Sequence, residues 1–237
     1  MVPLARDHPA IGTVRPVRIL VTNDDGIDSV GLHELARALV DLGEVTVVAP
    51  DTEYSGAGAS LGAMHLIRPE VHDAHIDGID QSWSVSGPPG LCVVYSRLGL
   101  FGDSFDLVVA GINRGPNTGR STLFSGTIGA VLAGERFGWS GMAVSADVPV
   151  TGGTGAVGAP GHVHWETAAA VAQVILPWLV DAPQRTVLNL NAPDVPLAEL
   201  QGIRWAGLAS VGGVRTVITG RDDTGLGEPG EQRARPG

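Results

Sequence analysis

Oxygen-bearing side chains follow three separate apolar runs, and their types suit a hard metal ion. Asp24 and Asp25 come directly after the first run, Ser55 a few residues after the second, and Asn113 directly after the third. Carboxylate, hydroxyl and amide oxygens are ligands preferred by Mg²⁺, Mn²⁺ and Ca²⁺, and the chain lacks the Cys/His spacing of a zinc site. Two adjacent carboxylates also repel each other unless a cation neutralises them. The pattern therefore predicts a divalent-metal site.

Each of these residues also has a plausible structural role. Asp24-Asp25-Gly26 is typical of a tight turn, because Asn, Asp and Gly dominate turns. Ser55 lies in the Gly/Ser-rich stretch YSGAGAS, which equally suits a mobile loop, and Asn113 equally suits a turn cap. Taken one at a time, none of them decides between turn and ligand.

A second feature, SGTIGAVLAGE, has the residues of an anion-binding helix N-terminus. Ser125 suits the N-cap, and Gly126 and Thr127 leave backbone N–H groups free in the first turn. Free donors and the helix dipole together favour a phosphate there, although capping alone is the competing interpretation. Arg114 and Asn117, in the preceding loop, add a cation and an amide to the same edge.

Other motifs in the sequence support other kinds of site only weakly. The glycines at 56, 58 and 62 have GxGxxxG spacing and do not open the first helix, so a dinucleotide fingerprint is not predicted. His162 and His164 are interpreted as surface residues rather than ligands, because they are isolated from the acidic cluster. Cys92 is interpreted as a small buried hydrophobe.

The elements that must position these residues alternate along the chain. Buried strands are predicted at 17–22, 44–50, 105–111, 141–146 and 186–191, and helices at 31–43, 89–98, 125–137 and 165–179. This alternation predicts an α/β fold, Rossmann-like and three-layered (αβα), with a mainly parallel sheet. Ligands bind outside the carboxyl ends of such strands, which is where the candidate residues fall.

Composition and charge further limit the type of protein and its partners. The 237 residues are 43% hydrophobic and 17% charged, which supports one medium-sized globular domain. A formal charge of −10 argues against nucleic acid as a partner, and no apolar run is long enough to span a membrane. With one cysteine and no hydrophobic leader at its start, the chain is expected in the cytoplasm. We expect an N-terminal extension at 1–16, the main domain at 17–201, and an arm with a flexible polar tail at 202–237.

Four blocks in the chain resemble the stationary-phase survival protein SurE family. They are RILVTNDDGIDSVGLHELARAL, VTVVAPDTEYSGAG, FDLVVAGINRGPNTG and FSGTIGAVLAGERFGWSGMAVS, and the similarity runs from about residue 18 to residue 193. The resemblance implies a metal-dependent phosphomonoesterase that hydrolyses nucleoside 5′- or 3′-monophosphates, on a Rossmann-like fold. It also implies a homodimer or tetramer, of which the homodimer is expected here because the C-terminal region is shortened.

The resemblance also assigns residues. It implies one Mg²⁺ or Mn²⁺ per subunit, with Asp24, Asp25, Ser55 and Asn113 as ligands. It implies a phosphate-binding set of Asn23, Asn117, Ser125, Gly126 and Thr127, to which the sequence adds Arg114. Asp24 and Asp25 are the catalytic candidates, with Asp24 orienting or deprotonating a water or itself acting as the nucleophile.

Two departures from the family pattern bear on the substrate. Tyr54 stands where members often carry a basic residue, and Leu91 replaces an aspartate. Two alternatives therefore stay open: a non-catalytic nucleotide-binding protein on the same fold, or a phosphatase for a different small phosphomonoester in a dedicated biosynthetic pathway.

Overall fold

The computed structural model describes residues 15–62, 68–148, 162–209, 214–221 and 227–233. Most of the N-terminal extension expected at 1–16 lies outside these ranges. Within them, no helix is long and apolar enough to cross a lipid bilayer.

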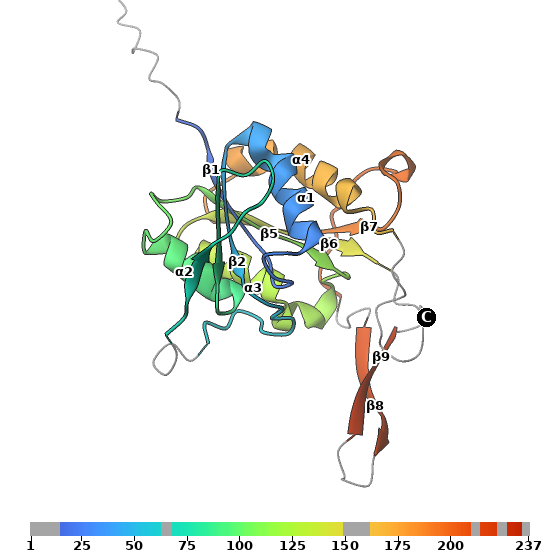
Figure 1. Ribbon diagram of the computed structural model, residues 1–237. Coiled ribbons are helices and arrows are strands. Elements are labelled where there is room, and N and C mark those ends of the chain that lie inside the picture. Colours follow the sequence, from blue (N-terminus) through green and yellow to red (C-terminus); the bar gives the residue numbers. More distant parts are fainter. Residues whose placement is uncertain (1–14, 63–67, 149–161, 210–213, 222–226, 234–237) are drawn as a thin grey trace, which may run out of the picture.

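A seven-stranded sheet forms the centre of the molecule (Figure 1). Its strands are β1 (Arg18–Thr22), β2 (Glu44–Pro50), β3 (Val71–Asp73), β4 (Gln81–Val85), β5 (Leu107–Arg114), β6 (Ser140–Asp147) and β7 (Val187–Pro193), in the spatial order β3-β4-β2-β1-β5-β6-β7. All neighbours pair in parallel except β3, which runs antiparallel to β4. The predicted α/β fold with a mainly parallel sheet is confirmed.

Helices cover both faces of this sheet (Figure 1). On one face α1 (Val30–Leu39) packs with α4 (Trp165–Asp181), and on the other α2 (Pro89–Arg97) packs with α3 (Gly126–Arg136). Each face has its own buried cluster of hydrophobic side chains, so the sheet is buried on both sides. Burial on both faces explains why β1, β2 and β5 are almost uninterrupted runs of apolar residues.

Capping residues set where the helices begin. The Ser29 hydroxyl accepts from the Leu32 N–H at 3.2 Å, and the Ser125 hydroxyl accepts from the Ile128 N–H at 3.1 Å. Pro89 occupies the first turn of α2, where its missing N–H costs nothing. The first helix was expected to reach Gly43, but α1 ends at Leu39, and the Gly43 φ of 171° is extended backbone. A Cβ there would lie 2.2 Å from the Val17 carbonyl oxygen, so close packing is what requires glycine at this position.

The structure contains strands that the apolar pattern does not predict. β4 reads QSWSV, where serines alternate with larger residues, and β3 has only three residues. Near the C-terminus, β8 (Val214–Arg221) pairs antiparallel with β9 (Gly227–Arg233) in a separate two-stranded sheet. Two antiparallel strands therefore lie within the region 202–237, where the sequence analysis expected an arm and a flexible polar tail.

Candidate metal and phosphate site

Two candidate metal ligands belong to neighbouring strands, because Asp25 follows β1 and Asn113 is in β5. β1 sits between β2 and β5, and Thr22 pairs with Ala110 in parallel register. Asp25 and Asn113 each lie three positions beyond that pair, at the same carboxyl edge of the sheet. The strands β2 and β4 lie on one side of β1, and the next parallel strand, β5, lies on its other side, so the strand order reverses here. Such a switch point is where open α/β sheets bind their ligands.

Asn23 closes the turn that follows β1. Its side-chain amide donates to the Gly26 carbonyl oxygen at 2.9 Å and to the Ser29 hydroxyl at 2.8 Å, while its Oδ1 accepts from the Gly26 N–H at 3.2 Å. Gly26 has φ 103°, a left-handed conformation that favours glycine. Both ends of the Asn23 amide are thus engaged in shaping the turn, and the phosphate-binding role implied by the resemblance is not visible in its contacts.

Asp24 points from β1 to the N-terminus of α3. It is 3% exposed, and its Oδ1 accepts from the Thr127 hydroxyl at 2.7 Å. Burial raises the pKa of Asp24, against the opposing effect of hydrogen bonds from the Thr127 side chain and from the backbone of Thr127 and Gly126. The helix end predicted to hold a phosphate therefore already stabilises one anion, the Asp24 carboxylate.

Asp25 has excess negative charge around it. Burial, followed by the charges of Asp24 and Glu53, raises the pKa of Asp25 to about 7, against the opposing effect of Arg114. Glu53 is a carboxylate that the sequence analysis did not single out, although it lies two residues before Ser55. Three acidic groups and one arginine form a site whose charge a divalent cation would balance.

The loop that carries Ser55 is held against Asp24. The Tyr54 N–H donates to the Asp24 carbonyl oxygen at 2.7 Å, and the Gly58 N–H donates to the Phe124 carbonyl oxygen at 3.0 Å. Ser55 itself is exposed, and its hydroxyl donates to Glu53 Oε1 at 2.8 Å. The loop backbone therefore contacts Asp24, whereas the Ser55 hydroxyl is engaged with Glu53.

Asn113 and Arg114 end β5 beside Asp25. The Asn113 side-chain N–H donates to the Gly115 carbonyl oxygen at 2.7 Å, which leaves Oδ1 as the atom suited to a cation. Arg114 is exposed and lines a cavity of about 310 Å³ together with Asp25, Ser29, Val30, Gly31, Val163 and Trp165. The cavity opens beside Asp25, so a ligand in it would reach the acidic cluster.

Asn117 is buried in a network with the last strands. Its side-chain N–H donates to the Ser145 hydroxyl at 3.0 Å, and its backbone N–H donates to Asn191 Oδ1 at 2.7 Å. Asn189 in turn donates to the Asn117 carbonyl oxygen at 2.8 Å. These partners on β6 and β7 were not predicted, although the alternating asparagines of TVLNLN are an unusual feature in a buried-strand pattern.

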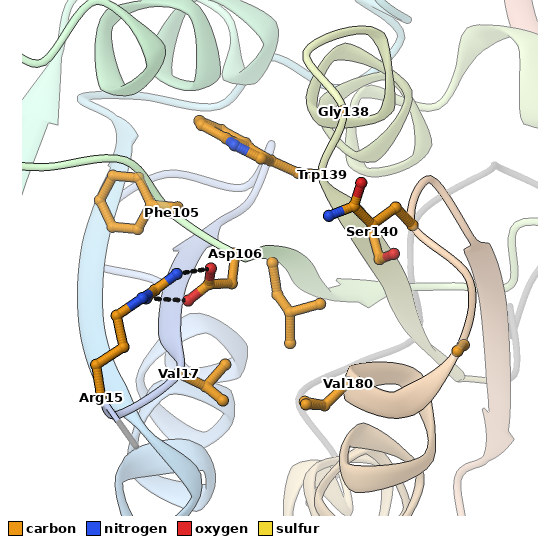
Figure 2. Close-up of a pocket in the computed structure, with 11 residues that line it drawn as sticks. Arg15, Val17, Phe105, Asp106, Gly138, Trp139, Ser140 and Val180 are labelled. Carbon is orange, nitrogen blue, oxygen red and sulfur yellow. Dashed lines mark hydrogen bonds and ion pairs between the residues drawn. The ribbon is translucent and has the colours of Figure 1, made fainter. Parts of the chain in front are cut away.

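A larger cavity of about 360 Å³ lies away from this site (Figure 2). Its lining includes Val17, Leu107 and Ser140, which stand at or just before the amino-terminal ends of β1, β5 and β6. An Arg15–Asp106 ion pair stands at one side of it. Since open α/β sheets bind ligands at the opposite, carboxyl ends, we assign the candidate site to the smaller cavity.

Comparisons with known proteins agree with this arrangement. Residues 19–212 match the family described as "Survival protein SurE". The chain belongs to the SurE family. A relative from Cronobacter sakazakii named 5′/3′-nucleotidase SurE is 38% identical over 223 residues, which cover 91% of this chain and 81% of the relative. One from Klebsiella pneumoniae with the same name is 37% identical over 93% of this chain and 83% of its own length.

A solved SurE structure has the same fold. The crystal structure of the SurE protein from Aquifex aeolicus superimposes with a TM-score of 0.73 at 28% identity, covering 91% of this chain and 82% of that one. Within the SurE pattern, the departure at Leu91 falls in the core, where the side chain is 1% exposed and packs beside Gly87. Leu91 is therefore a packing residue in this chain. Cys92, next to it, is buried as predicted.

Proposed function

We propose that this SurE-family chain is a metal-dependent phosphomonoesterase that hydrolyses nucleoside 5′- or 3′-monophosphates to nucleoside and phosphate. The observation that carries the proposal is the excess of carboxylate charge at the switch point, next to the N-terminus of α3. The names of the relatives, 5′/3′-nucleotidases, support the substrate class. The enzyme would act in the cytoplasm and as a homodimer.

The residues present fit a hard divalent ion, Mg²⁺ or Mn²⁺, at one site per subunit. Asp24, Asp25, Ser55 and Asn113 would hold it, because carboxylate, hydroxyl and amide oxygens are the donors such ions prefer. Besides the effect of burial, the charges of Asp24 and Glu53 raise the pKa of Asp25, and a bound divalent cation would offset this repulsion. When bound, the ion would act as a Lewis acid on the phosphoryl group and lower the pKa of water.

The protein groups then have separate tasks. Asp24 is our choice for orienting or deprotonating the attacking water, because the α3 N-terminus and the Thr127 hydroxyl fix its carboxylate. The first turn of α3, from Ser125, and Arg114 supply the positive potential that favours a phosphate next to Asp24 and Asp25. Asn23 and Asn117 hold the turn and the loop in which these groups stand.

The test is Asp24→Asn, assayed for phosphate release from nucleoside monophosphates with Mg²⁺ or Mn²⁺ and with chelator. We expect a loss of about 10²-fold or more in kcat, the usual contribution of a positioned acid or base. Asp28→Asn is the matched control, because Asp28 is an exposed carboxylate four residues away and should leave activity unchanged. Near-normal turnover in Asp24→Asn would contradict the assignment. Nucleotide-induced stabilisation of the wild type without phosphate release would instead support the non-catalytic alternative.

A further inference from the structure

Two histidines and a glutamate gather at the start of α4, outside the acidic site. One ligand atom each from His162, His164 and Glu166 lies within 4.8 Å of the others, and His162 Nε2 is 3.7 Å from Glu166 Oε1. Among the described residues this is the one group of three His, Cys, Asp or Glu side chains close enough to share an ion. The acidic site is of another kind, because it combines carboxylates with hydroxyl and amide donors.

The local structure explains why these side chains meet. His162 and His164 alternate along the segment that leads into α4, and their rings pack edge to face with centroids 4.9 Å apart. Val163, between them, is 9% exposed and belongs to the core cluster on the α1 and α4 face. Glu166 is in the first turn of α4, four positions after His162 in the sequence.

A second, independent observation concerns the orientation of His164. Its Nδ1 lies 3.0 Å from Asp194 Oδ1, and the same carboxylate oxygen accepts from the His164 backbone N–H at 2.8 Å. The Asp194 side chain is only 11% exposed, and it follows directly after β7. Histidines that bind metals usually donate their other ring N–H to a carboxylate, which fixes the tautomer and the ring orientation. Asp194 thus prepares His164 to bind an ion through Nε2.

We propose that His162, His164 and Glu166 form a second metal site, for a borderline ion such as Zn²⁺, with Asp194 as the positioning residue of His164. Two imidazoles and one carboxylate suit Zn²⁺ better than Mg²⁺, which prefers oxygen ligands. Zn²⁺ binds such ligands at about 2.0–2.2 Å, so the group must contract. The side chains that must move are accessible, since His162 is 75% and Glu166 56% exposed.

The position of this site gives it a consequence for the cavity. Val163 and Trp165, which alternate with the three ligands, line the cavity of about 310 Å³ that also contains Asp25 and Arg114. An ion held by residues 162, 164 and 166 would restrain the backbone of this segment. Zn²⁺ would therefore stabilise one wall of the cavity without occupying the acidic site.

Isothermal titration calorimetry on the chelator-stripped full chain tests the proposal, with Zn²⁺ added in the presence of excess Mg²⁺. We expect one Zn²⁺ per chain in the wild type. His162→Ala and Glu166→Gln should each weaken its affinity about tenfold or more, and Asp194→Asn, acting through His164, about tenfold. His75→Ala is the matched control: His75 is exposed and lies 3.2 Å from Asp77, a histidine–carboxylate pair like that of His162 and Glu166.

Two further measurements separate the sites. In an Asp25→Asn background the Zn²⁺ affinity should stay as in the wild type, and X-ray absorption at the zinc edge should show two imidazole ligands. The proposal would be overturned by unchanged affinity in both His162→Ala and Glu166→Gln, by absence of micromolar binding in the wild type, or by loss of the site with Asp25→Asn. Because the readout is Zn²⁺ binding, none of these outcomes depends on phosphatase activity.

Discussion

The Thr127 hydroxyl donates to Asp24 Oδ1 at 2.7 Å, joining the first turn of α3 to the end of β1 across 103 positions of sequence. Both residues are buried, at 0% and 3% exposure. A buried carboxylate needs hydrogen-bond donors to stay ionised, and this hydroxyl is the side-chain donor that the structure provides. The contact therefore links the helix end that we propose for phosphate binding directly to a proposed metal ligand.

Thr127→Val should damage the site while leaving its shape intact. Valine keeps the β-branched shape and removes the hydroxyl, and a hydrogen bond to a charged group contributes about 1.5–3 kcal/mol. We expect kcat/KM to fall about tenfold or more. Steady-state kinetics with Mn²⁺ measures this, and Thr127→Ser, which keeps the hydroxyl, should retain most of the activity. Equal losses in both variants would show that packing, not the hydrogen bond, is what matters.

Gly126→Ala should displace Asp24. A Cβ on Gly126 would lie 2.7 Å from the Asp24 Cβ and 2.8 Å from its Oδ2, closer than real contacts allow. Overpacking of this kind costs about 1–3 kcal/mol, and here it also moves the carboxylate. We expect a lower melting temperature and at least a tenfold loss of metal-dependent turnover. Gly207→Ala is the control, because nothing lies within 4 Å of a Cβ there, and it should behave as the wild type.

The position of the acidic site could be predicted from the sequence, whereas the partners of its residues could not. Buried parallel strands appear as apolar runs, so the ends of β1 and β5, and with them Asp25 and Asn113, could be placed on one edge. The strand β4 was not predicted, because Ser82 and Ser84 interrupt its run of apolar residues. The order of the strands in the sheet depends on tertiary packing and cannot be predicted from local sequence patterns. The neighbours of each strand end could therefore not be predicted either.

The roles of the polar residues show the same limit more sharply. Asn23 was assigned to phosphate by resemblance, yet its amide is taken up by Gly26 and Ser29 within its own turn. His164 was interpreted as a surface residue because it is isolated from the acidic cluster, and only the fold brings it to its partner Asp194, which is 30 positions away in the chain. Residue type and spacing indicate what chemistry is available, and tertiary contacts decide which atoms remain free for it.

Asp25→Asn should stabilise the metal-free protein and abolish its stabilisation by metal. Replacing the carboxylate removes the repulsion from Asp24 and Glu53, which we expect to raise the free energy of unfolding by on the order of 1 kcal/mol at pH 8. In the wild type, Mn²⁺ at 100 times its Kd should add about 2.7 kcal/mol. Denaturant unfolding with Mn²⁺ and with chelator measures both effects. A variant that is still stabilised by Mn²⁺ to the wild-type extent would remove Asp25 from the ligand set.

The Arg15–Asp106 pair predicts an acid-sensitive contribution to stability at the amino-terminal end of the sheet. Asp106 accepts from both Arg15 terminal nitrogens, at 2.7 and 2.5 Å, and from the Arg18 backbone N–H at 2.9 Å (Figure 2). The hydrogen bond from Arg15 holds the pKa of Asp106 below its ordinary value. A carboxyl with a lowered folded-state pKa stabilises the protein above its unfolded pKa of about 3.9 and loses that contribution as the pH falls through the folded value.

Asp106→Asn should therefore destabilise the protein at neutral pH and have little effect in acid. Because the pair is partly solvent-exposed and screened, we expect a loss of about 0.5–1 kcal/mol at pH 7. The difference from the wild type should shrink as the pH falls below the unfolded-state pKa of about 3.9 and through the lower folded-state pKa of Asp106. Urea unfolding at several pH values measures it, with Asp103→Asn, a fully exposed partner of Arg18, as the control. A deficit that persists unchanged after the pH has fallen through the titration of Asp106 would mean that the ion pair is not its cause, because protonation removes the charge of Asp106.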